Sequence, residues 1–182
     1  MEDVMIQPAT SDQIPALVDF IIKAREDMFP FLDKSSSDQL ATHELANFHR
    51  TYLDNPQGAF ITAQVNGRLI GSIGYRAYDG RFSHFCLEPD LDQVVEIVRL
   101  YVHPQFRRAG LASKLFATLL ESAQRRGLKQ LYLHTHPFLL SASVFWKCQG
   151  FSVITEDDDP IWQTIHMSRL LRTDEDALVT ES

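Results

Sequence analysis

The first part of the chain alternates apolar and polar positions in a way that predicts a short strand followed by two helices. Val4–Gln7 has the pattern of a strand. After Thr10 and Ser11, either of which can cap a helix, apolar residues recur at helical spacing at Ile14, Leu17, Val18, Ile21 and Ile22. Pro30 ends this pattern because proline cannot continue a helix, and a second helix is expected over residues 37–53.

A hairpin is the clearest local signal. Asn66-Gly67 separates two runs of β-forming residues, Ala59–Val65 and Arg68–Tyr78, and this pair suits the positive φ angles of a tight turn. Residues 79–93 show neither a helical nor a strand period, so a long loop is expected there. The apolar, β-branched run Val94–Val102 then predicts a buried strand.

The second half of the chain predicts an alternation of helices and strands. A helix opens near Arg108 and stops at Gly127, with one apolar face formed by Leu111, Leu115, Phe116, Leu119 and Leu120. A strand, a short helix and two closing strands should follow at Gln130–Thr135, Ser141–Gln149, Phe151–Thr155 and Ile161–Leu170. We therefore expect one α/β domain over residues 1–172 and a polar, frayed tail over residues 173–182.

Composition narrows the class of protein. A chain of 182 residues with 45% hydrophobic and 23% charged residues fits one globular domain. No run of eighteen apolar residues occurs, which predicts no membrane-spanning helix, and the N-terminus lacks the apolar core of a secretory signal. Cys86 and Cys148 lie far apart, so a disulfide framework is not expected. These features predict a cytoplasmic protein.

Charge is distributed unevenly along the chain. The net charge of −7 argues against a general nucleic-acid binder. Residues 99–129 nevertheless contain seven basic residues and one acidic residue, while the rest of the chain has a balance of −13. Such a basic segment fits either a seat for a small polyanionic ligand or a helix with a solvated basic face.

The junction between the strand ending at Val102 and the next helix has the composition of a phosphate-binding loop. Arg107 and Arg108 supply charge, and Gly110 lets the backbone approach a ligand closely. The first turn of the following helix presents backbone N–H groups and the positive end of the helix dipole. Neither GxxxxGK[ST] nor GxGxxG occurs in the chain, so the two common nucleotide-binding loops are excluded.

This loop resembles a known family. Arg107-Arg-Ala-Gly-Leu-Ala112 matches the [RQ]xxGx[GA] loop of the GNAT superfamily of N-acetyltransferases, and Arg99–Pro104 resembles the strand before it. Phe145–Phe151 is similar to the family's Tyr-x-x-x-Gly-Phe segment. The resemblance covers residues 94–151. It implies an α/β (α+β) domain with a mixed, mostly antiparallel sheet, a splayed parallel strand pair and helices on both faces.

The resemblance also implies a co-substrate, acetyl-CoA, and no metal. In the family, loop amides hold the CoA pyrophosphate, and main-chain groups of the preceding strand hold the pantetheine arm. Transfer to a primary amine then occurs by direct attack in a ternary complex. The residues carried over are Leu100, Tyr101, Val102, Arg107, Arg108, Ala109, Gly110, Leu111, Ala112, Ser113 and Trp146.

Glu96 is the candidate general base, acting directly or through water. It lies fourteen residues before Gly110, the spacing of the base glutamate in the histone-acetylating members of the family. A carboxylate inside an apolar strand would have a raised pKa, which suits proton removal near neutral pH. The alternative is a residue that faces solvent or pairs with Arg99.

Trp146 departs from the family pattern. Many members carry a tyrosine here that protonates the leaving thiolate, and an indole N–H is too weak an acid for that role. The thiolate then leaves unassisted or through water, or Tyr101 or Tyr132 contributes. A third alternative is a protein that binds acyl-CoA and catalyses poorly.

Histidine and cysteine candidates remain. His134 and His136 share one face of a strand, but a metal site would need a further ligand, so His136 is expected either to face the substrate or to pack. Cys148 allows a covalent thioester route or is a core residue. Aromatic loop residues border the acceptor site in the family and predict either a pocket or core contacts: Phe29, Phe31, Phe82, His84 and Phe85.

The partners follow from these features. The acceptor is expected to be a small-molecule or peptide amine, and the acidic balance outside the basic segment favours a cationic one. No nucleic-acid or membrane partner is expected, and a homodimer stays open. The alternatives to acetyl transfer are transfer of a different acyl group and a regulatory module that binds acyl-CoA.

Overall fold

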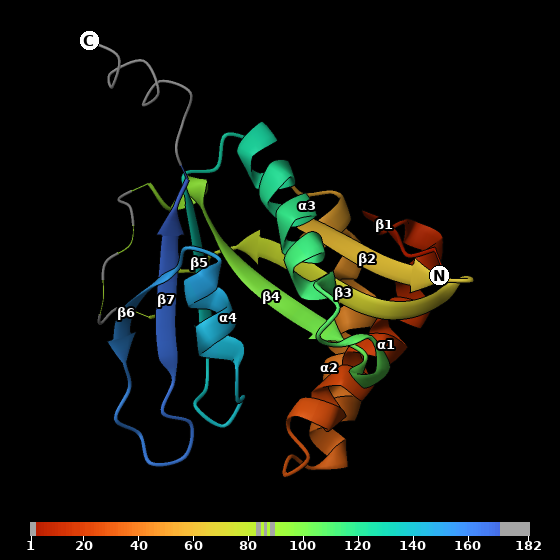
Figure 1. Ribbon diagram of the computed structural model, residues 1–182, viewed down its shortest axis with the longest axis horizontal. Coiled ribbons are helices and arrows are strands. Elements are labelled where there is room, and N and C mark those ends of the chain that lie inside the picture. The colour runs from red at the N-terminus through yellow and green to blue at the C-terminus, as the bar shows by residue number, and fades with distance from the viewer. Residues whose placement is uncertain (1–2, 83–84, 86, 88–89, 172–182) are drawn as a thin grey trace. The chain divides into compact units, whose positions relative to one another are not determined.

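The computed structural model describes residues 3–82, 85, 87 and 90–171, and its strands form a mixed sheet (Figure 1). The order across the sheet is β1-β2-β3-β4-β5-β7-β6. β4 pairs with β5 in parallel, whereas the β1/β2, β2/β3, β5/β7 and β6/β7 pairs are antiparallel. The expected mixed, mostly antiparallel sheet with one parallel pair is therefore confirmed. The strands are Met5–Pro8, Ala59–Val65, Arg68–Ala77, Val94–Val102, Gln130–Thr135, Ser152–Glu156 and Ile165–Leu170, numbered β1 to β7 in chain order.

The helices are α1 (Ile14–Met28), α2 (Lys34–Phe48), α3 (Leu111–Arg125) and α4 (Ala142–Cys148). The described residues fall into two compact units. Unit 1 contains the chain up to Arg76 together with residues 98–120, and unit 2 contains residues 77–97 and the chain from Glu121 onward. β4 and α3 thus contribute to both units. That residues 1–172 act as one functional domain stays a prediction.

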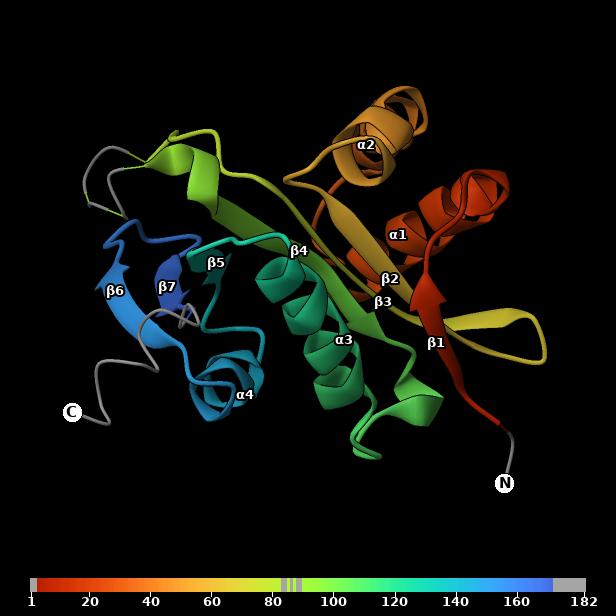
Figure 2. The same cartoon turned by 90° about the horizontal axis from the view of Figure 1, so that it is seen from above.

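Unit 1 is built on the β1-β2-β3 meander. The β2–β3 hairpin turns at Asn66 and Gly67, which have φ angles of 51° and 76° and so confirm the expected tight turn. α1 and α2 cover one face of these strands, and α3 lies on the other (Figure 2). The α1 and α2 face buries a cluster made of Ala9, Leu17, Val18, Ile21, Phe48, Tyr52 and Phe60.

α3 packs closely on β3. A Cβ atom at Gly71 would lie 2.9 Å from Cδ1 of Leu115, so any larger residue here would force the Leu115 side chain to shift. Leu115 is fully buried, and Phe116 and Leu119 are buried beside it on the same side of α3. This contact fixes the beginning of α3 against the sheet of unit 1.

Arg99 interrupts β4 with a left-handed backbone conformation. Its φ angle is 60°, which a non-glycine residue adopts only at a cost. Three groups hold it there: Ser72 Oγ donates to its carbonyl oxygen at 2.8 Å, and its guanidinium bonds Glu44 at 2.5 Å and also hydrogen-bonds Tyr52. Glu44 and Tyr52 are buried. The distortion of β4 is therefore anchored by the segment from α2 to the turn after it.

Unit 2 contains β5, β7 and β6, with α4 against one face of these strands (Figures 1 and 2). The parallel register of β4 with β5 covers Val94 to Glu96, and Glu96 lies opposite Tyr132. Tyr78, Val94 and Tyr132 form a buried cluster, and the loop residues Phe82 and Phe85 pack against it.

Three boundaries differ from the sequence prediction by three residues or more. α3 begins at Leu111 and not near Arg108, because Arg108 and Gly110 both have positive φ. β7 begins at Ile165, since the side chain of Asp159 accepts hydrogen bonds from the N–H groups of residues 161–163 and holds them in a turn. α2 starts three residues early because the Asp33 side chain caps it, and residues 49–53 continue it as one π-helical turn.

Removing the carboxylate of Glu44 should destabilise the protein, because Arg99 would keep a partly buried charge without its counter-ion. We expect Glu44→Ala to lower the free energy of unfolding by about 2 kcal/mol, less than for a fully buried pair since Arg99 is partly exposed. Urea denaturation measures this. Glu26→Ala, on the exposed side of α1, is the matched control and should change stability by less than about 0.5 kcal/mol. Equal midpoints for the two variants would contradict the anchoring role.

Candidate active site

The loop that enters α3 has the geometry of an anion-binding site. Arg108 and Gly110 have φ angles of 64° and 76°, and the first helical hydrogen bond runs from the Lys114 N–H to the Gly110 carbonyl at 3.1 Å. The N–H groups of Leu111 and Ala112 belong to the first turn, where helix geometry provides no intrahelical partner. A Cβ atom at Gly110 would meet nothing within 4 Å. The start of α3 is thus an open backbone concavity that suits a phosphate group.

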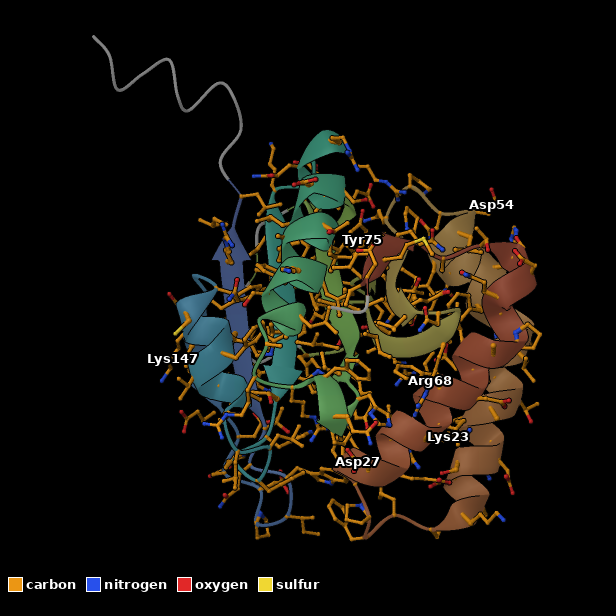
Figure 3. The ribbon with its side chains drawn as sticks, turned by 45° about the vertical axis from the view of Figure 1, so that its right-hand side comes forward. Lys23, Asp27, Asp54, Arg68, Tyr75 and Lys147 are labelled. Atoms are coloured by element: carbon orange, nitrogen blue, oxygen red, sulfur yellow. The ribbon has the colours of Figure 1, made fainter. Side chains whose placement is uncertain are left out.

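The side chain of Arg107 is occupied within unit 1. Its Nε donates to the Val102 carbonyl at 2.8 Å, and its Nη2 donates to Asp27 Oδ2 at 2.8 Å. The sequence predicted that this guanidinium supplies charge for phosphate oxygens and that the Val102 main chain is available to a ligand. In the structure Arg107 ties the end of β4 to Asp27, which lies in the last turn of α1 (Figure 3), and the roles expected for Arg107 and Val102 at a ligand stay predictions.

Asp27 also receives a hydrogen bond from Tyr101. The Tyr101 hydroxyl donates to Asp27 Oδ2 at 3.0 Å, and the Arg107 guanidinium lies 5.2 Å from the centre of the Tyr101 ring. The hydrogen bond from Arg107 lowers the pKa of Asp27. Burial, reinforced by the hydrogen bond to Asp27, raises the pKa of Tyr101. Tyr101 is therefore a neutral donor that orients a carboxylate, and its expected help to the leaving thiolate stays a prediction.

Glu96 lies at the centre of a charged network in unit 2. Its side chain is 0% exposed, and Arg81 binds both of its oxygens, with Nη1 donating to Oε2 at 3.0 Å and Nη2 donating to Oε1. His134 Nδ1 lies 3.1 Å from Oε1. Burial alone would lower the pKa of Arg81, but the hydrogen bonds and charge of Glu96 raise it. The alternatives of a solvent-facing Glu96 or a pair with Arg99 are both wrong.

His136 lies two residues after His134, immediately beyond the end of β5. Its Nδ1 is 3.1 Å from the Trp162 carbonyl oxygen, and its ring stacks on Phe138 with centroids 5.1 Å apart. Burial lowers the pKa of His136, against the opposing effect of the Trp162 carbonyl. The His136 side chain is buried, which fits the packed alternative, and a substrate-facing role stays a prediction.

A second network in unit 2 was not found by sequence reasoning. The Tyr132 hydroxyl lies 2.7 Å from His166 Nδ1, and His166 Nε2 lies 3.1 Å from Asp157 Oδ2. Burial, together with the charge of Glu96, raises the pKa of Tyr132. Phe82 and Phe85 pack on the same rings, which identifies them as core contacts. The register of β5 with β7 brings these side chains together. The one signal in the sequence was that Tyr132 and His134, two residues apart, share one face of a predicted strand.

The remaining candidates lie elsewhere in the molecule. Trp146 is buried on α4 and packs edge-on against Phe145 and Phe151, at 4.9 and 5.2 Å between centroids. Cys148 is exposed on α4, so its expectation as a core residue is wrong. Phe29 and Phe31 contact each other edge to face. His84 and Cys86 lie outside the described residues.

Neither a metal cluster nor a membrane span is found in the part of the chain that the structure describes. Within residues 3–82, 85, 87 and 90–171, no three His, Cys, Asp or Glu side chains are placed to hold a metal ion. None of the helices in those ranges has the length and apolar character needed to cross a bilayer.

The lowered pKa of His136 predicts how stability depends on pH. The unfolded chain, with an ordinary histidine pKa of about 6.5, binds this proton more readily than the folded chain. Stability should therefore be highest above about pH 6.5 and should fall as the pH drops below it. Urea unfolding of the parent, His136→Phe and Phe138→Leu across this range measures the effect. His136→Phe should flatten the slope, whereas Phe138→Leu should lower stability but keep the slope. Parallel curves for parent and His136→Phe would contradict the assignment.

The curated relatives that the chain resembles are N-acetyltransferases. The chain is 29% identical over 115 residues to the uncharacterized N-acetyltransferase YjgM of Escherichia coli K12, which covers 63% of each protein. It is 23% identical over 126 residues to human N-acetyltransferase 8, covering 69% of this chain and 52% of the relative. The chain therefore matches about half to two thirds of the length of these curated relatives.

Solved structures show the same fold. A GNAT-family acetyltransferase from Staphylococcus aureus Mu50 superposes with a TM-score of 0.73 at 20% identity, covering 93% of this chain and 100% of the other. The PaiA N-acetyltransferase from Thermoplasma acidophilum, solved in complex with coenzyme A, gives 0.70 at 13% identity over 93% and 99%. The model of the acetyltransferase (GNAT) family matches residues 19–151. With its fold and its α3 entry loop, the chain belongs to the acetyltransferase (GNAT) family.

Proposed function

We propose that this protein transfers an acetyl group from acetyl-CoA to a primary amine by direct attack in a ternary complex. The observation that carries the proposal is the open backbone concavity at the start of α3, where Arg108 and Gly110 have left-handed conformations. It is supported by the complexes of PaiA with coenzyme A and of a YncA acetyltransferase from Salmonella typhimurium with acetyl-CoA.

The co-substrate is held mainly by backbone groups. The N–H groups from Arg108 to Ser113 surround the pyrophosphate, and the helix dipole of α3 adds a favourable field. Main-chain groups of Leu100 and Tyr101 hold the pantetheine arm. Because Arg107 bonds Val102 and Asp27, it shapes the loop and leaves Arg108, which is exposed, as the arginine able to meet a phosphate.

The chemistry then requires two proton movements. The amine must lose a proton to become a nucleophile, and the leaving thiolate must gain one or depart as the anion. Glu96 belongs to the amine side of the reaction, but its lack of exposure means that another group or a water must connect it to the amine. Trp146 is a packing residue in this scheme. The CoA thiolate leaves without a dedicated acid, as the thiol pKa of about 8.5 allows.

The acceptor is proposed to be a cationic small-molecule or peptide amine, on the basis of the acidic charge outside residues 99–129. A cytoplasmic location and a homodimer stay predictions. Trp146 is buried at the position where many members of the family carry a tyrosine that protonates the leaving thiolate. This favours one second candidate, a regulatory module that binds acyl-CoA and transfers its acyl group poorly.

Turnover with defined amines separates the two functions. We expect CoA release from acetyl-CoA in the presence of at least one member of a panel of spermidine, tryptamine, aspartate, lysine and an alanyl peptide. Acetyl-CoA at 100 times its Kd should also stabilise the fold by about 2.7 kcal/mol. Stabilisation without CoA release would favour the regulatory module. No stabilisation at all would contradict both, and reaction only with neutral or anionic amines would contradict a cationic acceptor.

The α3 entry loop can be tested with a matched pair of glycines. Gly110→Asp places a negative charge where the pyrophosphate should lie, so CoA affinity should fall at least tenfold, or about 1.4 kcal/mol. Gly127→Asp is the control, because Gly127 has a similar φ of 69°, meets nothing within 4 Å, and lies just beyond the other end of α3. Calorimetric titration with CoA measures both variants. Equal losses of affinity would show that strain, and not the phosphate site, explains the effect.

A further inference from the structure

Three charged or titratable side chains of unit 2 form a row that ends at the surface. Arg81 lies in the loop after β3, Glu96 on β4 and His134 on β5. The Glu96 carboxylate bridges the other two, since Arg81 binds both of its oxygens and His134 Nδ1 lies 3.1 Å from Oε1. Glu96 is 0% exposed, while the His134 side chain is 33% exposed. The Arg81 side chain is 31% exposed as well, but a guanidinium does not release its proton, so any exchange of protons between Glu96 and a bound molecule passes most directly through His134.

The hydrogen-bond pattern fixes which nitrogen of His134 carries the proton. With Arg81 on both oxygens, Glu96 is held as a carboxylate, and a carboxylate can only accept hydrogen bonds. His134 Nδ1 must then be the donor, so the neutral ring has its lone pair on Nε2. No hydrogen bond to Nε2 is found among the described residues. The ring thus presents a proton acceptor on the side away from Glu96.

We propose that His134 is the general base that deprotonates the acceptor amine, with Glu96 and Arg81 as positioning residues. This inference rests on the proposed acetyl transfer and reassigns the role that the sequence gave to Glu96. His134 Nε2 first takes a proton from the ammonium form of the acceptor, which frees the nitrogen lone pair. The lone pair attacks the thioester carbonyl carbon, the C–N bond forms and the C–S bond breaks. The nitrogen loses its second proton to water, the thiolate takes up a proton from solvent, and His134 later returns its proton to water.

Glu96 gives His134 an advantage over the other two histidines of the cluster. When Nε2 takes a proton, the imidazolium is stabilised by the carboxylate at Nδ1, as in other histidine–carboxylate pairs. His136 Nδ1 lies against the carbonyl oxygen of Trp162, and burial lowers the pKa of His136. His166 is fully buried, and both of its ring nitrogens have hydrogen-bond partners.

The surroundings of His134 contain several titratable groups. Glu96 on β4 faces it through a hydrogen bond, and Arg81 in the loop after β3 binds that carboxylate. Tyr132 on β5, His136 just after β5 and His166 on β7 face it through ring contacts. The Phe82 ring contacts His134 edge to face at 5.9 Å between centroids. This packing restricts rotation of the imidazole and keeps Nδ1 on Glu96.

Kinetics of His134→Gln test the role of the base. With the best amine of the panel above, we expect kcat/KM for the amine to fall about a hundredfold at neutral pH, with KM for acetyl-CoA unchanged. The deficit should shrink as the pH rises and the amine deprotonates without help. His43→Gln, an exposed histidine on α2, is the control and should match the parent. A His134→Gln variant within threefold of the parent at neutral pH would overturn the proposal.

A second measurement does not depend on turnover. Long-range ¹H–¹⁵N spectra of the imidazole rings should show the parent His134 with its proton on Nδ1, and Glu96→Gln should convert it to a mixture of tautomers. A parent ring with its proton on Nε2 would overturn the proposal even if His134→Gln were inactive. If no amine of the panel reacts, the proposed function fails and the assignment of a base fails with it. If the parent reacts and His134→Gln matches it, only the base is wrong.

Discussion

The left-handed backbone of Arg99 is the constraint on which the arrangement of β4 depends. This conformation costs a residue with a Cβ atom about 1–2 kcal/mol of conformational free energy relative to a regular strand. Contacts from the surrounding structure must therefore hold the residue in place. Ser72 holds its carbonyl, while Glu44 and Tyr52 hold its side chain. The register of β4 with β5 runs only over Val94 to Glu96, before this point. One strand thereby carries a paired segment that bears Glu96 and a second segment that leads into the α3 entry loop.

Carboxylates with more than one partner recur in both units. Asp27 receives hydrogen bonds from Arg107 and Tyr101, and Glu96 receives them from Arg81 and His134. In each case an arginine binds the carboxylate and fixes its position, and the carboxylate in turn orients its second hydrogen-bond partner. Some of the acidic residues in this chain are thus structural. Each carboxylate–arginine pair is neutral, so the net charge of −7 is carried by the other side chains.

The sequence predicted the parts of the fold and of the site that depend on local structure. The Asn66-Gly67 turn, the buried strand before His103 and the glycine at the entry to α3 all follow from backbone preferences of neighbouring residues. Arg81 could not be found, because residues 79–93 carry no period that indicates where a side chain points. The Arg107–Asp27 pair joins residues 80 apart in the chain, and the Tyr132–His166 contact depends on the register of two strands. Such pairings are set by tertiary packing, which composition and spacing do not encode.

Because Trp146 is a buried packing residue and not an acid, catalysis of proton transfer in the proposed reaction must act mainly on the amine. A thiol with a pKa of about 8.5 is only 1.5 units above neutral pH, so its departure as an anion costs about 2 kcal/mol. An alkyl amine that titrates like lysine, at about 10.4, needs about 4–5 kcal/mol to lose its proton at pH 7. A protein without an acid for the thiolate thus leaves unassisted the less costly of the two proton transfers. The larger one requires a proton acceptor beside the amine, and in the proposal this acceptor is the accessible imidazole of His134, paired with the buried carboxylate of Glu96.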